Sequence, residues 1–164
     1  MKVSAALAGG LAGTITVASL HEAMRRVTPT APRMDLLDMD LLRKGLTKMN
    51  KKIPADGALQ RWAVGGELLC DTAYFSLAAA GGRKKVWWCG ALLGLAAGVA
   101  AVVLPKSMGL PSEPGNKTMG TKLMTIGLYF LGGLAAAAVA QLVEGSNKSS
   151  NELEYTEYIE EVFQ

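Results

Sequence analysis

Four apolar blocks, each about as long as a membrane span, organise the hydrophobic pattern of this chain. They cover residues 3–24, 62–80, 86–104 and 122–143, and polar segments separate them. About 20 helical residues cross the roughly 30 Å of hydrocarbon in a bilayer, because each residue advances the helix by about 1.5 Å. The pattern predicts an all-α fold, a bundle of four transmembrane helices in which residues 1–164 form a single membrane domain.

The third and first apolar blocks carry further evidence on whether they span the membrane. Trp87 and Trp88 stand at the start of the third block, where aromatic side chains favour the membrane interface, and Pro105 follows its end. The first block could instead be a cleaved signal peptide, with Lys2 ahead of its apolar region. Small residues occupy most rows of this block, which is typical of a helix that packs closely against neighbours. We therefore interpret the first block as a retained span.

The longest connection, residues 25–61, contains a helical periodicity of its own. After a turn sequence at 29–32, apolar residues recur near helical spacing from Met34 to Met49, and Asp35 is suited to the N-cap. Five basic residues crowd the second half of this segment: Arg43, Lys44, Lys48, Lys51 and Lys52. The pattern predicts an amphipathic helix at about 34–52, lying either in the headgroup plane or across the water-facing end of the bundle.

The remaining connections differ in composition. The segment 105–121 is rich in proline and glycine and is expected to be irregular, whereas residues 81–85 are short enough for a tight turn. The tail at 144–164 is polar and then acidic, which fits either a partner-docking segment or a short solvated helix.

Basic residues are distributed unevenly between the two sides of such a bundle. Most of them lie in the 25–61 and 105–121 connections, so the positive-inside rule places these connections in the cytoplasm, and we expect the membrane to be a bacterial inner membrane. The cluster Arg83, Lys84 and Lys85 opposes this orientation, because it would then lie outside.

Composition excludes several classes of function. Half of the 164 residues are hydrophobic and 19% are charged, and two cysteines with one histidine cannot form a cysteine-rich zinc site. We find no nucleophile–base pair and no set of metal ligands, so we expect neither an enzyme nor a cofactor. The basic residues flank apolar spans without interleaved aromatic residues, which argues against nucleic acid as a partner.

Two acidic residues interrupt the second apolar block. Glu67, Asp71 and Tyr74 follow i, i+4, i+7 spacing and share one face of a helix. Counted from Arg61 at the interface, the two acids lie about 9 and 15 Å deep, where an ionised Asp costs about 2.5–3.5 kcal/mol on the insertion scale. Acids at this depth are expected to have polar partners.

The first span offers such partners at matching depths. Counting from its end pairs His21 or Arg25 with Glu67, and Thr14 or Thr16 with Asp71. A proton or ion relay is one interpretation, because chains of Asp, Glu and His inside membranes often carry protons. Interhelical hydrogen bonds that fix the packing of the bundle are the other.

Glycines form rows on two of the predicted spans. Gly9 and Gly13 lie one turn apart on the first, and Gly90, Gly94 and Gly98 form a ladder on the third. Such rows allow close approach of backbones, either within one bundle or between copies. The sequence therefore favours a non-enzymatic accessory or scaffold subunit, in a homo-oligomer or beside other membrane subunits in the lipid bilayer. The alternative is a small proton- or ion-coupled channel or carrier that uses Glu67 and Asp71.

Overall fold

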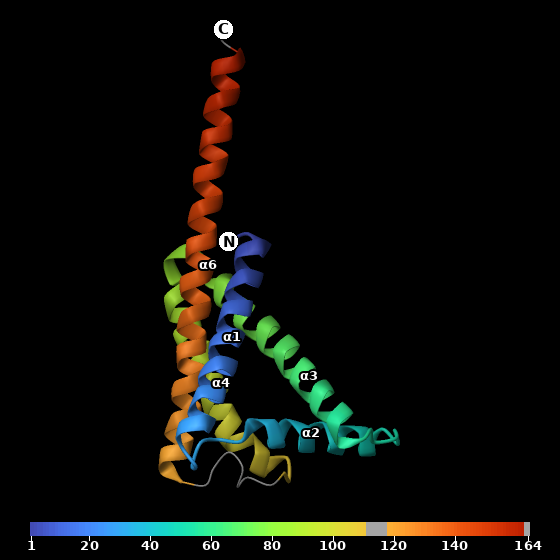
Figure 1. The fold of residues 1–164 in the computed structure, drawn as a ribbon. Coiled ribbons are helices and arrows are strands. Elements are labelled where there is room, and N and C mark those ends of the chain that lie inside the picture. The colour runs from blue at the N-terminus through green and yellow to red at the C-terminus, as the bar shows by residue number, and fades with distance from the viewer. Residues whose placement is uncertain (111–117, 163–164) are drawn as a thin grey trace.

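The computed structural model describes residues 1–110 and 118–162, with side chains up to residue 146, and this part of the chain is mainly helical and contains no strand (Figure 1). The expected all-α fold is confirmed. The helices are α1 (Val3–Val27), α2 (Met34–Lys48), α3 (Asp56–Ser76), the 3₁₀ helix η1 (Leu77–Gly81), α4 (Gly82–Ser107) and α6 (Met119–Val162).

Three segments of the described chain are long and apolar enough to cross a membrane: Val3–Val27, Asp56–Ser107 and Met119–Ser146. The second segment contains α3, η1 and α4, and Figure 1 shows that it reverses direction between α3 and α4. Gly82 makes this reversal with a φ of 66°, in the left-handed region that favours glycine. The observed turn is therefore shorter than the expected one at 81–85, because Arg83, Lys84 and Lys85 already belong to the first turn of α4.

Helix α6 lies at the centre of the packed part of the molecule, between α1 and α4. The glycine rows make this packing close. A Cβ added at Gly9 would lie 2.6 Å from the backbone oxygen of Ala136, and one added at Gly13 would lie 2.8 Å from that of Gly132. Such distances leave no room for a side chain, so α1 and α6 meet backbone to backbone.

The glycine ladder of α4 lies against a neighbouring face of α6. A Cβ at Gly94 would lie 2.5 Å from the backbone oxygen of Tyr129, and one at Gly98 would lie 2.7 Å from the Cα of Ile126. Gly90 approaches Gly133 in the same way. The sequence left open whether the glycine rows pack within one bundle or between copies of the chain. In this structure they pack within one chain.

Helix α3 departs from the other three long helices. Its C-terminal end packs against α1, where Phe75 is only 1% exposed and the Thr72 hydroxyl donates to Thr14 Oγ1 at 3.2 Å. From there α3 runs obliquely away from the bundle, and its far end meets α2 (Figure 1). A space between α3 and the bundle results from this inclination.

Helix α2 lies across one end of the molecule (Figure 1) and is tied to two long helices. Arg25 at the end of α1 forms an ion pair with Asp35 at 3.2 Å. Lys44 donates hydrogen bonds to the carbonyl oxygens of Met108 and Gly109, just beyond the end of α4. Both attachments use exposed or partly buried groups, which suits a helix at the boundary between apolar and polar surroundings.

Two further expected boundaries are wrong. The amphipathic helix ends at Lys48, before the expected residue 52, because Asn50 adopts a left-handed φ of 53°. Helix α4 continues through Pro105 to Ser107, and the carbonyl of Pro105 still accepts a hydrogen bond from Leu110 at 2.9 Å.

The last helix extends beyond Met119–Ser146, the segment that is apolar enough to cross a membrane. Helix α6 continues to Val162 without a proline to stop it, and it projects well beyond the bundle (Figure 1). The expected polar tail is thus an extension of this helix. Its docking role rests on side chains after residue 146, which lie outside the described ones.

Candidate functional site: an acid-lined cavity beside α3

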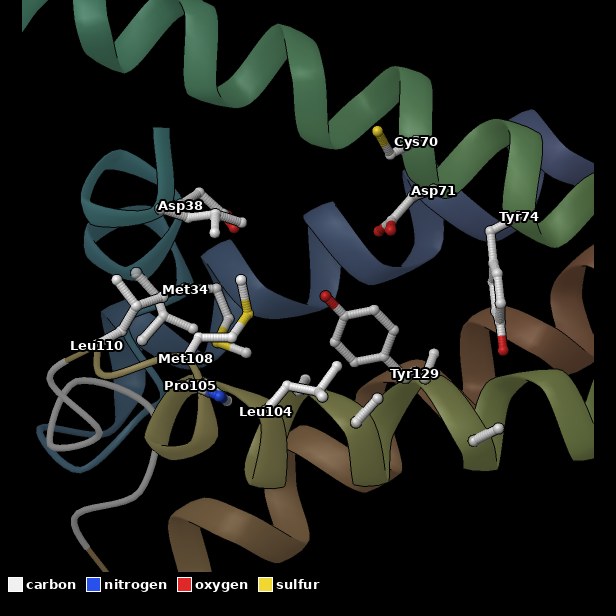
Figure 2. A pocket seen from close by; sticks show the side chains of 16 residues that line it. Met34, Asp38, Cys70, Asp71, Tyr74, Leu104, Pro105, Met108, Leu110 and Tyr129 are labelled. Atoms are coloured by element: carbon white, nitrogen blue, oxygen red, sulfur yellow. The ribbon is translucent and has the colours of Figure 1, made fainter. Parts of the chain in front are cut away.

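The inclination of α3 leaves a cavity of about 570 Å³ between α2, α3, α4 and α6 (Figure 2). A second cavity of about 300 Å³ lies beside it, between α2 and the earlier turns of α3. The two cavities share five lining residues: Asp38, Leu41, Cys70, Asp71 and Tyr129. We treat them as one site with two lobes.

Polar side chains from three helices point into the larger lobe. Figure 2 shows Asp38 on α2 and Asp71 on α3 on opposite sides of the space, with the hydroxyl of Tyr129 directed between them. Tyr129 reaches the cavity from α6, where Phe75 stacks against its ring with centroids 6.5 Å apart. The site therefore depends on residues that are far apart in the sequence.

The structure brings together part of the predicted set of polar residues. Asp71 lines both lobes, Glu67 lines the smaller and Tyr74 the larger, as their common helix face requires. The Tyr74 hydroxyl also donates a hydrogen bond of 2.9 Å to the carbonyl oxygen of Leu93 on α4. Tyr74 thus bridges α3 and α4 at the wall of the larger lobe.

The partners expected from α1 lie elsewhere. His21 Nε2 lies 2.6 Å from the carbonyl oxygen of Pro32, and Arg25 pairs with Glu22 and Asp35. Neither lines a lobe, so the expected pairing with Glu67 is wrong.

The threonines of α1 are also occupied. Thr16 donates to the Ala12 carbonyl at 2.8 Å, and Thr14 donates to that of Gly10 while accepting from Thr72. The expected pairing of Thr14 or Thr16 with Asp71 is therefore wrong as well. The physical reason is the inclination of α3: its C-terminal end contacts α1, whereas its earlier turns lie away from α1. Residues at equal depth along the two helices therefore do not meet.

Sequence reasoning missed two members of the site. Asp38 lines the larger lobe together with Met34, Leu37 and Leu41 of the same helix. Their i, i+3, i+4, i+7 spacing puts an acid on an apolar stripe, and that signal was available in the sequence. Tyr129 had no comparable signal, because a tyrosine in an apolar block is also compatible with contact to lipid or the membrane interface.

The carboxylates of the site have no basic neighbour in the described part of the chain. No Lys, Arg or His lines either lobe, and no ion pair joins Asp38, Glu67 or Asp71 to a described residue. Burial raises the pKa of Asp38 to about 7, and the charges of Asp71 and Asp35 act in the same direction. Asp38 is thus poised to exchange a proton near neutral pH.

Asp35, one turn away on α2, shows the contrasting case. Burial alone would raise the pKa of Asp35, but its bonds to Arg33 at 2.9 Å and the nearby Arg25 outweigh burial and lower that pKa. The difference between the two aspartates lies in their partners, since arginine neutralises Asp35 and nothing described neutralises Asp38.

The basic residues predicted for the membrane surface belong to a different part of α2 and the segment after it. Arg43 forms ion pairs with Asp40 and Asp56 at 3.1 Å each, and Lys44 donates a hydrogen bond to Gly109 just beyond the end of α4. Lys48, Lys51 and Lys52 follow at and beyond the end of the helix, and none of the five lines the site.

The spacing of the acidic groups is too wide for a metal centre. Among the described residues no group of three His, Cys, Asp or Glu side chains is close enough to hold a metal ion. The site can instead accept protons, or a cation large enough to contact carboxylates on two helices.

The three apolar segments indicate a multi-pass α-helical membrane protein, and the cavity gives it an acid-lined site. No family model matches the chain, and no curated protein or solved structure matches it. Its function is therefore argued from the site.

Proposed function

We propose that this protein is a small membrane carrier that binds protons or a monovalent cation at Asp71, Glu67 and Asp38. In this proposal α3 and α4 are separate passes, so that the chain crosses the membrane four times. One observation carries the proposal: three carboxyl groups from two helices converge on one cavity, and no described basic residue faces them.

The energetic argument concerns the cost of uncompensated charge. An ionised aspartate at the centre of a membrane span costs about 2.5–3.5 kcal/mol on the insertion scale, and neighbouring like charges add to this cost. A proton or a cation that enters the cavity removes the penalty without further rearrangement. Acids that served only to fix helix packing would be expected to have hydrogen-bond partners on the neighbouring helices. Asp38, Glu67 and Asp71 have none among the described residues.

The position of α3 supports a carrier rather than a static packing element. Its contacts with the bundle are concentrated at its C-terminal end, and the opposite end contacts α2. Between α3 and α4 lie the 3₁₀ helix η1 and the left-handed Gly82, and 3₁₀ stretches frequently mark hinges. A rotation of α3 about this junction would open or close the site.

Flux measurements on the purified chain in liposomes test the proposal. A potassium gradient with valinomycin sets the membrane potential, and an internal dye reports proton or cation uptake. We expect Asp71→Asn to reduce the flux to that of empty liposomes, because it removes the one carboxylate of α3 that lines both lobes.

The matched control is Asp40→Asn, an equally conservative change at an α2 residue that pairs with Arg43 and lines neither lobe. We expect flux close to that of the wild type. Undiminished flux through a folded Asp71→Asn protein would rule out the relay.

A second candidate function, an accessory subunit of a membrane assembly, is favoured by the projecting part of α6. A helix that continues to Val162 beyond the bundle offers a surface for another polypeptide (Figure 1). The particle extracted in mild detergent would then contain other chains at a fixed ratio. A particle built from this chain alone would count against an accessory role.

A further inference from the structure

The wall of the larger lobe is divided by chemistry. On the side of α4 it consists of Ala96, Ala97, Ala100, Ala101 and Leu104, which offer no hydrogen-bonding side chain. Asp38 and Asp71 stand on the other side, on α2 and α3 (Figure 2). A ligand that fills this lobe therefore contacts carboxylates at one end and methyl groups at the other.

This division is unfavourable for a small inorganic cation. Divalent cations take six or more oxygen ligands at short range, and sodium and potassium likewise need several oxygens to replace their water. The described residues provide no cluster of three metal-ligating side chains, and the α4 wall has no side-chain oxygen. A hydrated ion would leave much of the apolar wall without a partner.

The volume and the aromatic groups fit an organic cation instead. At about 570 Å³, the lobe lies within the roughly 300–1,000 Å³ typical of small-molecule sites. Tyr129 is partly buried, its hydroxyl is directed into the cavity, and that hydroxyl has no hydrogen-bond partner among the described residues. Tyrosine faces also attract ammonium groups through their π electrons.

We infer that the larger lobe binds a monovalent organic cation with an apolar body, an alkyl- or aryl-substituted ammonium. Asp38 and Asp71 neutralise its charge, Tyr129 contacts the ammonium group, and the alanine wall of α4 accepts the apolar substituents. The inference rests on the proposed carrier function, for which it names the cargo.

Tetraalkylammonium ions probe this assignment. Calorimetry on the full chain in nanodiscs of zwitterionic lipid gives their affinity near pH 8, with empty nanodiscs as the blank for partition into lipid. We expect tetrapropylammonium to bind at least about tenfold more tightly than tetramethylammonium, because the longer substituents bury more apolar surface against α4. Equal affinity for the two ions, or none for either, would overturn the assignment.

Two substitutions on α4 distinguish binding in the larger lobe from partition of the ion into lipid. Ala100→Phe fills the apolar wall and leaves every carboxylate in place, so we expect it to weaken tetrapropylammonium binding at least about tenfold. Val103→Phe adds the same ring at an exposed position that does not line the lobe, and we expect wild-type affinity. Equal binding by both variants would overturn the assignment.

Flux of the same protein variants in liposomes distinguishes this inference from the carrier function on which it rests. Proton flux that Asp71→Asn abolishes, without tetrapropylammonium binding, would overturn the organic-cation assignment and keep the carrier proposal. Binding that Ala100→Phe weakens, without flux of protons or tetrapropylammonium, would keep the ligand assignment and overturn the carrier proposal.

Discussion

Replacing Asp38 by asparagine tests whether the cavity holds an uncompensated carboxyl group. The amide side chain would keep the size of the carboxylate but carry no charge at any pH. Burial raises the pKa of Asp38 in the folded protein from the ordinary 3.8 to about 7, with Asp71 and Asp35 contributing in the same direction. Asp38→Asn should therefore change how stability depends on pH.

The sign follows from proton binding. Between pH 3.8 and about 7 the folded protein holds a proton on Asp38 that the unfolded chain has released, so the stability that Asp38 contributes falls as pH rises through this window. Each pH unit is worth about 1.4 kcal/mol, which sets a ceiling of about 3 kcal/mol between pH 5 and pH 8. Screening of a partly exposed site by solvent would bring the expected loss below this ceiling, to about 1–2 kcal/mol.

Thermal unfolding in mild detergent, followed by tryptophan fluorescence at several pH values, measures this loss. We expect Asp38→Asn to gain stability relative to the wild type as pH rises from 5 to 8. Asp40→Asn on the same helix removes a surface ion pair with Arg43, so its effect should be below about 1 kcal/mol and constant over this range. A pH-independent difference between Asp38→Asn and the wild type would refute the reasoning.

Two further predictions concern packing and the attachment of α2. Gly94→Ala should destabilise the protein by about 1–3 kcal/mol in the same unfolding assay, because its Cβ would lie 2.5 Å from a backbone oxygen of α6. Gly65→Ala has open space around it and should be neutral or stabilising; equal losses would contradict the packing argument. Lys44→Met should speed hydrogen exchange at the end of α4 severalfold, whereas Lys48→Met, one turn later on α2, should not. Unchanged exchange in Lys44→Met would show that the bond is dispensable.

The local structure of this protein could be derived from the sequence to a large extent. Apolar runs of about 20 residues and the 3.6-residue period predicted the long helices and α2, because helical hydrogen bonds connect residues close in sequence. The same period placed Glu67, Asp71 and Tyr74 on one face, and all three line the site. Boundaries failed where one residue decided them, as at Asn50 and Gly82.

The tertiary structure decided which residues meet. Counting depth along neighbouring spans assumes that they run parallel, whereas α3 is inclined and contacts α1 near one end, so Asp71 faces Tyr129 and Asp38 rather than Thr16. The glycine rows likewise required close contact without naming their partner, which is α6. Periodicity determines what a helix presents on each face, and only the packing of whole helices, summed over many weak contacts, determines what that face meets.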